Sequence, residues 1–273
     1  MSNRDDKTTA TQASEFRRKE REWQNSVGKD LLDIPWQQEG AAQVFERQFE
    51  RIASCLDLTL PGTIVEIGCG KGHLLSWLSQ SIGPNGPRLV GIDVSEAVAG
   101  ARERGLLGLR ADGEFLPLRD ESVRTVIYDG ALHHLIDYEA GLEDAYRKLQ
   151  PGGTFVLFEP VSSPFSRLVH RVLDPFIFSK VEYESPIDQH YKDFFEEKRI
   201  LKTLENLGMT VSHRRTDFLA YPLTGCYAGL AFGRSPKLMR TLIGIENVVD
   251  KVPPLQKLAG IVAWRFLIVA TKS

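Results

Sequence analysis

Cysteine is scarce in this sequence, which has only Cys55, Cys69 and Cys226 among its 273 residues. The three cysteines are widely spaced, odd in number and lack any CxxC pairing. Such a set favours neither a disulfide framework nor a zinc site. We therefore expect reduced thiols and a cytoplasmic protein.

An excess of charge of one sign and a long hydrophobic run are also missing. Lys and Arg number 34 against 36 Asp and Glu, for a net charge of -2. The sequence therefore lacks the excess of positive charge that is typical of nucleic-acid-binding proteins. The longest uncharged run, 218–233, contains a proline and several glycines. It is shorter than the roughly 18 to 20 apolar residues of a membrane span, although it can still touch a membrane surface. The first 24 residues are polar and lack the apolar core of a signal peptide.

From residue 61 onward, short β-branched runs alternate with helical stretches of ten to fifteen residues. This alternation predicts βαβ units and a parallel sheet, hence an α/β fold. The predicted strands are 63–67, 88–92, 106–110, 123–128, 153–159, 209–217 and 262–270. The predicted helices among them are 71–82, 95–104, 138–149 and 196–207.

The N-terminal part, residues 1–58, has two different patterns. Residues 1 to 25 lack the apolar residues that offset the entropy of ordering, so we expect a solvated arm. Phe45, Phe49 and Ile52 then recur at helical spacing and predict an amphipathic helix. Trp23, together with Trp36 and Phe16, belongs either to a lid over the site or to a helix held against the body by aromatic contacts.

Two stretches interrupt the alternation of strands and helices. One lies between the predicted core, 59–160, and the C-terminal part of the sheet, 196–273, and the other lies within that C-terminal part. The first is 161–195, for which we expect a substrate lid. The second is a helical insertion at 218–261. Insertions of this size are usually lids, substrate caps or oligomer surfaces. For 218–261 we expect either peripheral membrane contact or a homodimer interface.

The segment VEIGCGKGHLL (65–75) places Gly68, Gly70 and Gly72 between a strand and a helix. Glycines there allow positive φ and the close approach of a nucleotide. A dinucleotide fingerprint requires its third glycine at position 73, which is His73. This mismatch, and the lack of a Tyr-x-x-x-Lys pattern, oppose a nicotinamide-dependent oxidoreductase.

Carboxylates lie at the end of the first predicted strand and after the second and third. Glu66 precedes the glycine turn, where a carboxylate repels pyrophosphate and favours a positively charged ligand. Asp93 stands where an acidic side chain accepts hydrogen bonds from ribose hydroxyls. Asp112 is positioned for an adenine amino group, with the Gly113 and Glu114 backbone beside it. Together these residues predict recognition of a nucleoside without a phosphate site.

These motifs together resemble the class I S-adenosylmethionine-dependent methyltransferases of small-molecule type. The resemblance rests on ExGxGxG at 66–72, Asp93, ADGEFLP at 111–117, DGALHHL at 129–135 and LQPGGTFVLFEP at 149–160. It implies a three-layer, doubly wound, seven-stranded sheet of order 3-2-1-4-5-7-6 with the last strand antiparallel. We expect the two helical insertions to form a cap over this sheet.

The resemblance also implies the cofactor S-adenosyl-L-methionine and its binding residues. The glycine turn passes the methionine part, Asp93 holds the ribose and Asp112 with its neighbours holds the adenine. Asp129 and Gly130 lie near the amino-acid moiety. The predicted cofactor residues are Glu66, Gly68, Cys69, Gly70, Asp93, Val94, Asp112, Gly113, Glu114, Asp129 and Gly130. No metal is expected, because the acidic residues are sparser than in metal-dependent relatives.

Three histidines are candidates for the general base that methyl transfer to a hydroxyl needs. His133 and His134 follow the fourth predicted strand, and His190 lies in the first insertion. The alternative is that the histidine pair packs beside the cofactor and shapes the pocket wall, and that His190 is an exposed lid residue. Glu159 either binds the acceptor or is a hydrogen-bonded carboxylate at a strand end.

The sequence therefore predicts a biosynthetic methyltransferase for a small, partly hydrophobic acceptor such as a natural product, saccharide or lipid-linked molecule. O-methylation is the leading hypothesis. A C-methyltransferase of quinone or sterol type is the nearest alternative. A catalytically silent scaffold with the same fold is a third hypothesis, opposed by the intact set Glu66, Gly68, Gly70, Asp93 and Asp112.

Overall fold

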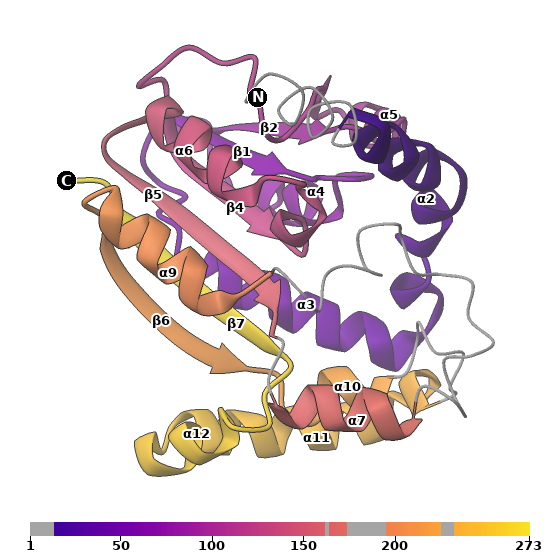
Figure 1. Ribbon diagram of the computed structural model, residues 1–273. Helices are drawn as coiled ribbons and strands as arrows, with labels where there is room; N and C mark the ends of the chain where they lie inside the picture. The colour runs from indigo at the N-terminus through magenta and orange to yellow at the C-terminus, as the bar shows by residue number, and fades with distance from the viewer. Residues whose placement is uncertain (1–13, 162–163, 174–194, 225–231) are drawn as a thin grey trace, which may run out of the picture.

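A computed structural model describes residues 14–161, 164–173, 195–224 and 232–273. Within them a seven-stranded sheet has the order β3-β2-β1-β4-β5-β7-β6 and carries helices on both faces (Figure 1). The strands are β1 (Thr63–Ile67), β2 (Arg88–Asp93), β3 (Leu107–Arg110), β4 (Val123–Asp129), β5 (Leu149–Pro160), β6 (Thr210–Thr216) and β7 (Arg265–Thr271).

The strand directions confirm the predicted fold class. Strands β1 to β5 pair in parallel, whereas β7 runs antiparallel to both β5 and β6. Most strand boundaries lie within a residue or two of the prediction. The exceptions are β7, which begins at Arg265, three residues after its predicted start, and β5. Strand β5 begins at Leu149 because this residue already pairs with Val123 across an irregularity in the register. The helix predicted to reach residue 149 therefore ends at Lys148.

The helices that cover the sheet come from both the predicted alternation and the insertions. The longer ones are α3 (Glu39–Ala53), α4 (His73–Ser79), α5 (Val98–Glu103), α6 (Tyr138–Lys148), α7 (Pro164–Leu173), α9 (Glu197–Asn206), α10 (Ala220–Thr224), α11 (Pro236–Asp250) and α12 (Pro253–Ala259). Short turns are η1 (Gln24–Gly28), α2 (Lys29–Leu31), η2 (Pro35–Gln37), η3 (Leu132–His134) and η6 (Phe232–Arg234).

Two apolar cores lie on opposite faces of the sheet. Helices α6 and α9 bury Leu142 and Leu204 against one face. Helices α3 and α4 bury Ile52 and Leu75 against the other. Because both faces are covered, the parallel strands are apolar almost throughout, as the TIVEI sequence of β1 illustrates.

The N-terminal segment differs from its prediction. Residues 14–23 are helical and continue into η1, so the expectation of a solvated arm is wrong for 14–25. Residues 1–13 lie outside the described residues. The helix orders without an apolar stripe because it buries polar side chains, among them Glu20, which is only 5% exposed. It is the indigo helix beside α5 in Figure 1.

The insertions leave the sheet at the ends of β5 and β6. Helix α7 follows β5, and α10, η6, α11 and α12 stand between β6 and β7. In Figure 1 these helices gather at the lower end of the molecule. Helix α11 packs directly on α3, where Glu246 pairs with Arg47.

Candidate functional site

A pocket opens at the carboxyl ends of the central strands. Strand β1 pairs with β2 on one side and β4 on the other, so the chain reverses its winding direction here. Ligands of open α/β sheets bind at this position. The pocket is lined by the following predicted site residues: Gly68, Gly70, Asp93, Val94, Asp112, Gly113, Glu114, Gly130 and His134.

The remaining predicted residues lie elsewhere. Glu66, Cys69 and Asp129 do not line the pocket but adjoin residues that do. His133 also stands behind the lining and contacts Glu159. His190 lies outside the described residues.

The glycine turn is held tightly against its neighbours. Gly68 has a φ of 75° and its N–H donates to the Ile92 carbonyl at 2.7 Å. A Cβ atom at this position would stand 2.3 Å from the Ala131 Cβ. Only glycine therefore allows the β1 turn to approach the loop after β4 this closely.

Asp93 connects β2 to the glycine turn. Its Oδ2 accepts from the Gly70 N–H at 2.8 Å, and its Oδ1 accepts from the N–H and Oγ of Ser95 at 2.8 and 2.6 Å. Each carboxylate oxygen has two lone pairs. Oδ2 therefore keeps acceptor capacity for a ligand while it fixes the turn, and Asp93 lines the pocket.

Asp112 and Glu114 have different functions in the pocket wall. Asp112 accepts from the Glu114 N–H through Oδ1 at 3.0 Å. Glu114 is buried, accepts from the N–H groups of Ile136 and Asp137, and pairs with Arg17. Its side chain is thus occupied in holding the wall together, and only its backbone is available for the predicted adenine contact.

A group of carboxylates lies beside the glycine turn. Glu66 is 4% exposed, and its Oε2 has no hydrogen-bond partner in the described part of the chain. Burial raises the pKa of Glu66 well above its ordinary value, and the nearby Asp129 and Asp93 raise it further. Three close acidic groups form a site whose free energy falls when a positive charge binds.

Asp129, behind the pocket lining, also has a raised pKa. Burial raises its pKa to about 7, although Arg265 opposes this shift. Gln48 donates to Asp129, and Arg265 donates to Gln48. The Arg265 guanidinium lies 3.7 Å from the Tyr221 ring centroid. Gln48, Arg265 and Tyr221 could not be predicted from the sequence, because no local pattern indicates that residues so distant along the chain meet.

The two adjacent histidines each contact a glutamate. Glu159 is fully buried and accepts from the Ala131 and Leu132 N–H groups at 2.9 and 2.7 Å. Its other oxygen lies 2.8 Å from His133 Nδ1, so it favours the tautomer with the proton on Nδ1 and the basic lone pair on Nε2. His134 Nδ1 lies 3.2 Å from Glu20. Glu159 thus acts as a hydrogen-bonded strand-end carboxylate, the second of its two predicted alternatives.

The N-terminal helix supplies a wall of the pocket that the sequence analysis did not foresee. Its lining residues are Arg17, Glu20, Arg21 and Gln24, followed by Leu32. The only available signal was the run of good helix formers from residue 15 to 22. Trp36, in contrast, packs on Phe49 and stacks on His73 with ring centroids 5.1 Å apart. It therefore attaches its segment to the body and does not line the pocket.

Neither a metal-binding group nor a helix able to span a membrane occurs among the described residues. No group of three or more His, Cys, Asp or Glu side chains there is arranged to hold a metal ion. None of the helices described is both long enough and apolar enough to cross a bilayer.

The sheet order, the switch-point pocket and the acidic cluster define a class I methyltransferase fold. Residues 65–157 match the family model described as Methyltransferase domain. This match and the sheet order are those of class I S-adenosylmethionine-dependent methyltransferase domains.

Three proteins that are similar to this chain have different names. A demethylmenaquinone methyltransferase from Symbiobacterium thermophilum is 30% identical over 39% of this chain and 45% of its own length. The S-adenosyl-L-methionine-dependent Diels-Alderase iccD from Talaromyces variabilis is 25% identical over 82% of this chain and 78% of its own. The [4+2]-cyclase SpnF has the same fold, with a TM-score of 0.56 and 18% identity over 84% of this chain and 81% of its own. The chain spans between 31% and 56% of the first three curated relatives that it matches.

Proposed function

We propose that this chain transfers the methyl group of S-adenosylmethionine to a small, partly hydrophobic molecule, with a hydroxyl oxygen as the acceptor atom. The observation that carries the proposal is the buried, unpaired carboxylate oxygen of Glu66 beside Asp93 and Asp129. This cluster suits a nucleoside that bears positive charge, and a neutral or anionic nucleotide would leave it uncompensated.

The residues present fit this cofactor. S-adenosylmethionine, when bound, supplies a methyl group that its sulfonium has already activated. Asp93 holds the ribose through the remaining lone pair of Oδ2, and Asp112 receives the adenine amino group at the pocket wall. The Cβ position of Gly130 has no atom within 4 Å, so this part of the wall leaves space for a ligand. Glu66 and Asp129 supply the negative charge.

The chain's part in the transfer step is to position the acceptor and remove its proton. Alignment of the two reactants can supply several kcal/mol of the barrier reduction, and a base contributes a factor of about 10² to 10⁴. His133, oriented by Glu159, and His134, which lines the pocket, are the described candidates. His190 is the third.

C-methylation of a quinone-like acceptor is the second candidate. It is favoured by the similarity to a demethylmenaquinone methyltransferase, by name a protein that acts on a quinone precursor. Carbon methylation also needs a base, so the histidines do not separate the two reactions.

Two measurements test the proposal. Calorimetric titration should show binding of S-adenosylmethionine and S-adenosylhomocysteine and none of NAD. Binding of NAD alone would overturn the assignment. A methyl-transfer assay with phenolic and demethylquinone acceptors, followed by NMR of the product, then distinguishes an O-methyl from a C-methyl group.

The base is tested by single replacements. His133→Asn and His134→Asn should each leave cofactor affinity nearly unchanged, and at least one should lower kcat about 100-fold or more. The same replacement at His213, on β6 away from the pocket, is the control. If kcat is unchanged in His133→Asn, His134→Asn and His190→Asn, no histidine is the base.

A further inference from the structure

Helix α11 packs Met239 and Leu242 against the body, but it departs from an ordinary surface helix on both of its sides. Its inward side buries Glu246, which is 0% exposed, pairs with Arg47 and accepts from the Leu219 N–H at 2.7 Å. Its outward side carries Ile245 and Val248, which are 46% and 63% exposed. A helix that faces water normally places charges outward and apolar residues inward. The outward side of α11 therefore combines exposed apolar side chains with exposed cations such as Lys237 and Arg240.

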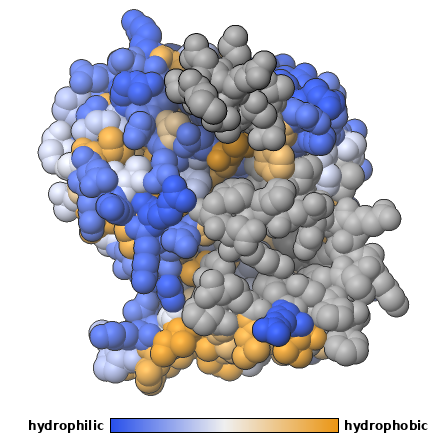
Figure 2. Space-filling model, in the orientation of Figure 1, coloured by the Kyte–Doolittle hydropathy of each residue, from blue (hydrophilic) through white to orange (hydrophobic). Residues whose placement is uncertain are grey.

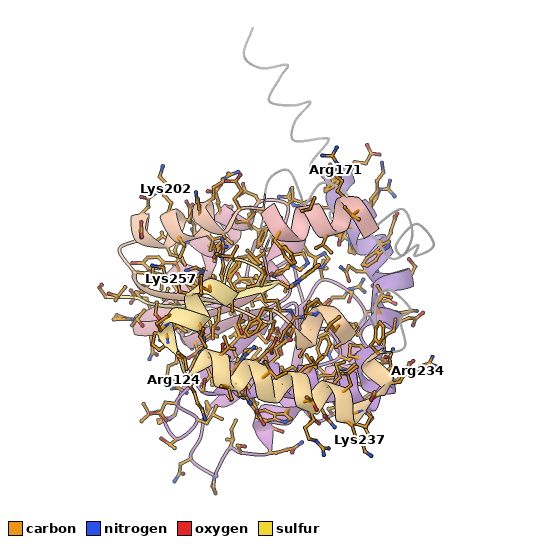
Figure 3. All side chains as sticks on the ribbon, turned by 90° about the horizontal axis from the view of Figure 1, so that it is seen from below. Arg124, Arg171, Lys202, Arg234, Lys237 and Lys257 are labelled. Atoms are coloured by element: carbon orange, nitrogen blue, oxygen red, sulfur yellow. The ribbon has the colours of Figure 1, made fainter. Side chains whose placement is uncertain are left out.

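The exposed apolar surface continues over the neighbouring helices. Helix α12 packs against α11 and is followed by an exposed Ile261. Helix α7 lies at the same lower end in Figure 1, across this end from α11 in the view from below (Figure 3). Figure 2 shows apolar side chains along this end. We define the lower face by six exposed apolar side chains of α7, α11, α12 and the turn after α12, which are 46–63% exposed: Leu168, Val172, Ile245, Val248, Leu258 and Ile261.

Basic side chains surround this face. Figure 3 shows Arg171, Arg234, Lys237 and Lys257 around the helices, seen from below. All four are exposed, and no ion pair is recorded for them in the part of the chain that the structure describes. The segment 218–261 has five basic residues against two acidic ones, whereas the whole chain has a net charge of -2. Both acidic residues, Glu246 and Asp250, are already paired with arginines of α3.

We propose that the lower face docks on the surface of a membrane that contains anionic lipids. Its apolar side chains enter the interfacial region, and the surrounding cations contact the lipid headgroups. These are the two contributions that a peripheral protein combines for stable membrane attachment. A symmetric dimer through the same face is less suitable, because an isologous contact brings two copies of the same positively charged surface together.

The position of the lower face relates it to the pocket. Helix α7 begins after β5 and α10 begins after β6, and β6 runs in the same direction as β5 because both are antiparallel to β7. Both insertions therefore start at the carboxyl edge of the sheet, where the pocket also lies. Docking would bring this edge of the sheet, rather than its amino edge, toward the bilayer.

Vesicle sedimentation with the full chain tests the proposal. The protein should sediment with phosphatidylcholine vesicles that contain about 30% phosphatidylglycerol, and high salt should weaken this binding. Lys237→Gln with Lys257→Gln should weaken binding about 25-fold, at about fivefold per cation near an anionic surface. Arg88→Gln with Arg119→Gln, exposed positions at the amino edge, should leave it unchanged.

The apolar contribution has its own matched pair. Leu168→Ser with Leu258→Ser should lower vesicle affinity by at least about tenfold. Leu60→Ser with Leu107→Ser, at leucines that are 51% and 49% exposed elsewhere, should not. A gain of signal complements these losses: Leu258→Trp should add fluorescence that brominated lipid quenches, and Leu107→Trp should not.

Three results would overturn the proposal. One is failure of the unmodified protein to bind anionic vesicles. Another is equal binding to vesicles with and without phosphatidylglycerol. The third is a dimer in sedimentation equilibrium that Leu168→Ser with Leu258→Ser abolishes while vesicles remain unbound, which would make the lower face a contact between two copies.

Discussion

Among single residues, Glu66 has a buried carboxylate oxygen for which the described residues supply no hydrogen-bond partner. Its raised pKa means that the free protein holds this group at a cost that a bound cation would remove. Glu66→Gln should therefore weaken S-adenosylmethionine binding by about 1–3 kcal/mol, the range for losing a charge-assisted interaction. Calorimetry measures this difference.

The matched control for Glu66 is Glu103→Gln, an exposed position on α5, which should leave affinity unchanged. In the absence of ligand at pH 8, Glu66→Gln should unfold at the same or a higher urea concentration than the unmodified protein. A loss of both stability and affinity would mean that Glu66 supports the fold and is not a ligand group.

Asp129 predicts a specific pH dependence of stability. Its folded pKa of about 7 exceeds the value of about 3.9 for an unfolded aspartate, so the folded state binds more protons between these values. This contribution to stability is complete below pH 4 and is lost as the pH rises to 7. Asp129→Asn keeps the acceptor for Gln48 and lacks the titration.

The Asp129→Asn variant should therefore gain about 1–3 kcal/mol over the unmodified protein between pH 4 and 8. The low end of this range applies if pocket water reaches the partly exposed carboxyl. Urea unfolding of the apoprotein at both pH values measures the difference. An equal difference at pH 4 and pH 8 would contradict the assigned titration.

At the scale of secondary-structure elements, α3 joins the sheet to the second insertion through buried charges. Arg47 and Arg51 of α3 pair with Glu246 and Asp250 of α11 and with Asp217 after β6. A buried pair that loses one partner leaves an uncompensated charge, which costs about 3–5 kcal/mol. Arg47→Met should destabilise the protein by this amount.

The double variant Arg47→Met with Glu246→Gln should recover part of that loss, because Gln still accepts from the Leu219 and Ala220 N–H groups. A double-mutant cycle by urea unfolding measures the coupling. Additive effects of the two changes would show that the pair does not act as a unit.

The N-terminal helix is the second element whose effect can be tested. Arg17 attaches it to the pocket wall through Glu114, whereas Arg18 pairs with Glu22 on the exposed side of the same helix. Arg17→Ala should raise the dissociation rate of S-adenosylmethionine about fivefold, which corresponds to about 1 kcal/mol for a partly exposed pair. Stopped-flow measurement should show no such change for Arg18→Ala.

In the molecule as a whole, the strands and the glycine turn of the predicted cofactor-binding core could be predicted from the sequence. Most of the elements around this core could not. Period-2 and period-3.6 patterns reveal the strands and helices because each depends on neighbouring residues. The glycine turn, Asp93 and Asp112 follow strand ends, so their meeting at one edge follows from the parallel sheet itself. Strand order, however, came from resemblance to a family and not from any local pattern.

The N-terminal helix shows why the remaining features escaped prediction. Its few apolar residues indicated a solvated arm, yet Glu20 is buried because His134 lies opposite it. The hydrogen-bonded group behind the pocket lining escaped prediction for the same reason. Its members Arg265, Gln48 and Asp129 are far apart in the chain and meet only after the sheet is complete.

The sequence by itself determined the α/β class, the glycine turn and the carboxylates at the ends of the first strands, because these depend on local spacing. Only the tertiary structure decided which carboxylates remain unpaired, which histidine a glutamate orients, and which side of α11 faces outward. The physical reason is that burial, charge pairing and pKa depend on what the rest of the chain places within a few ångströms of each group.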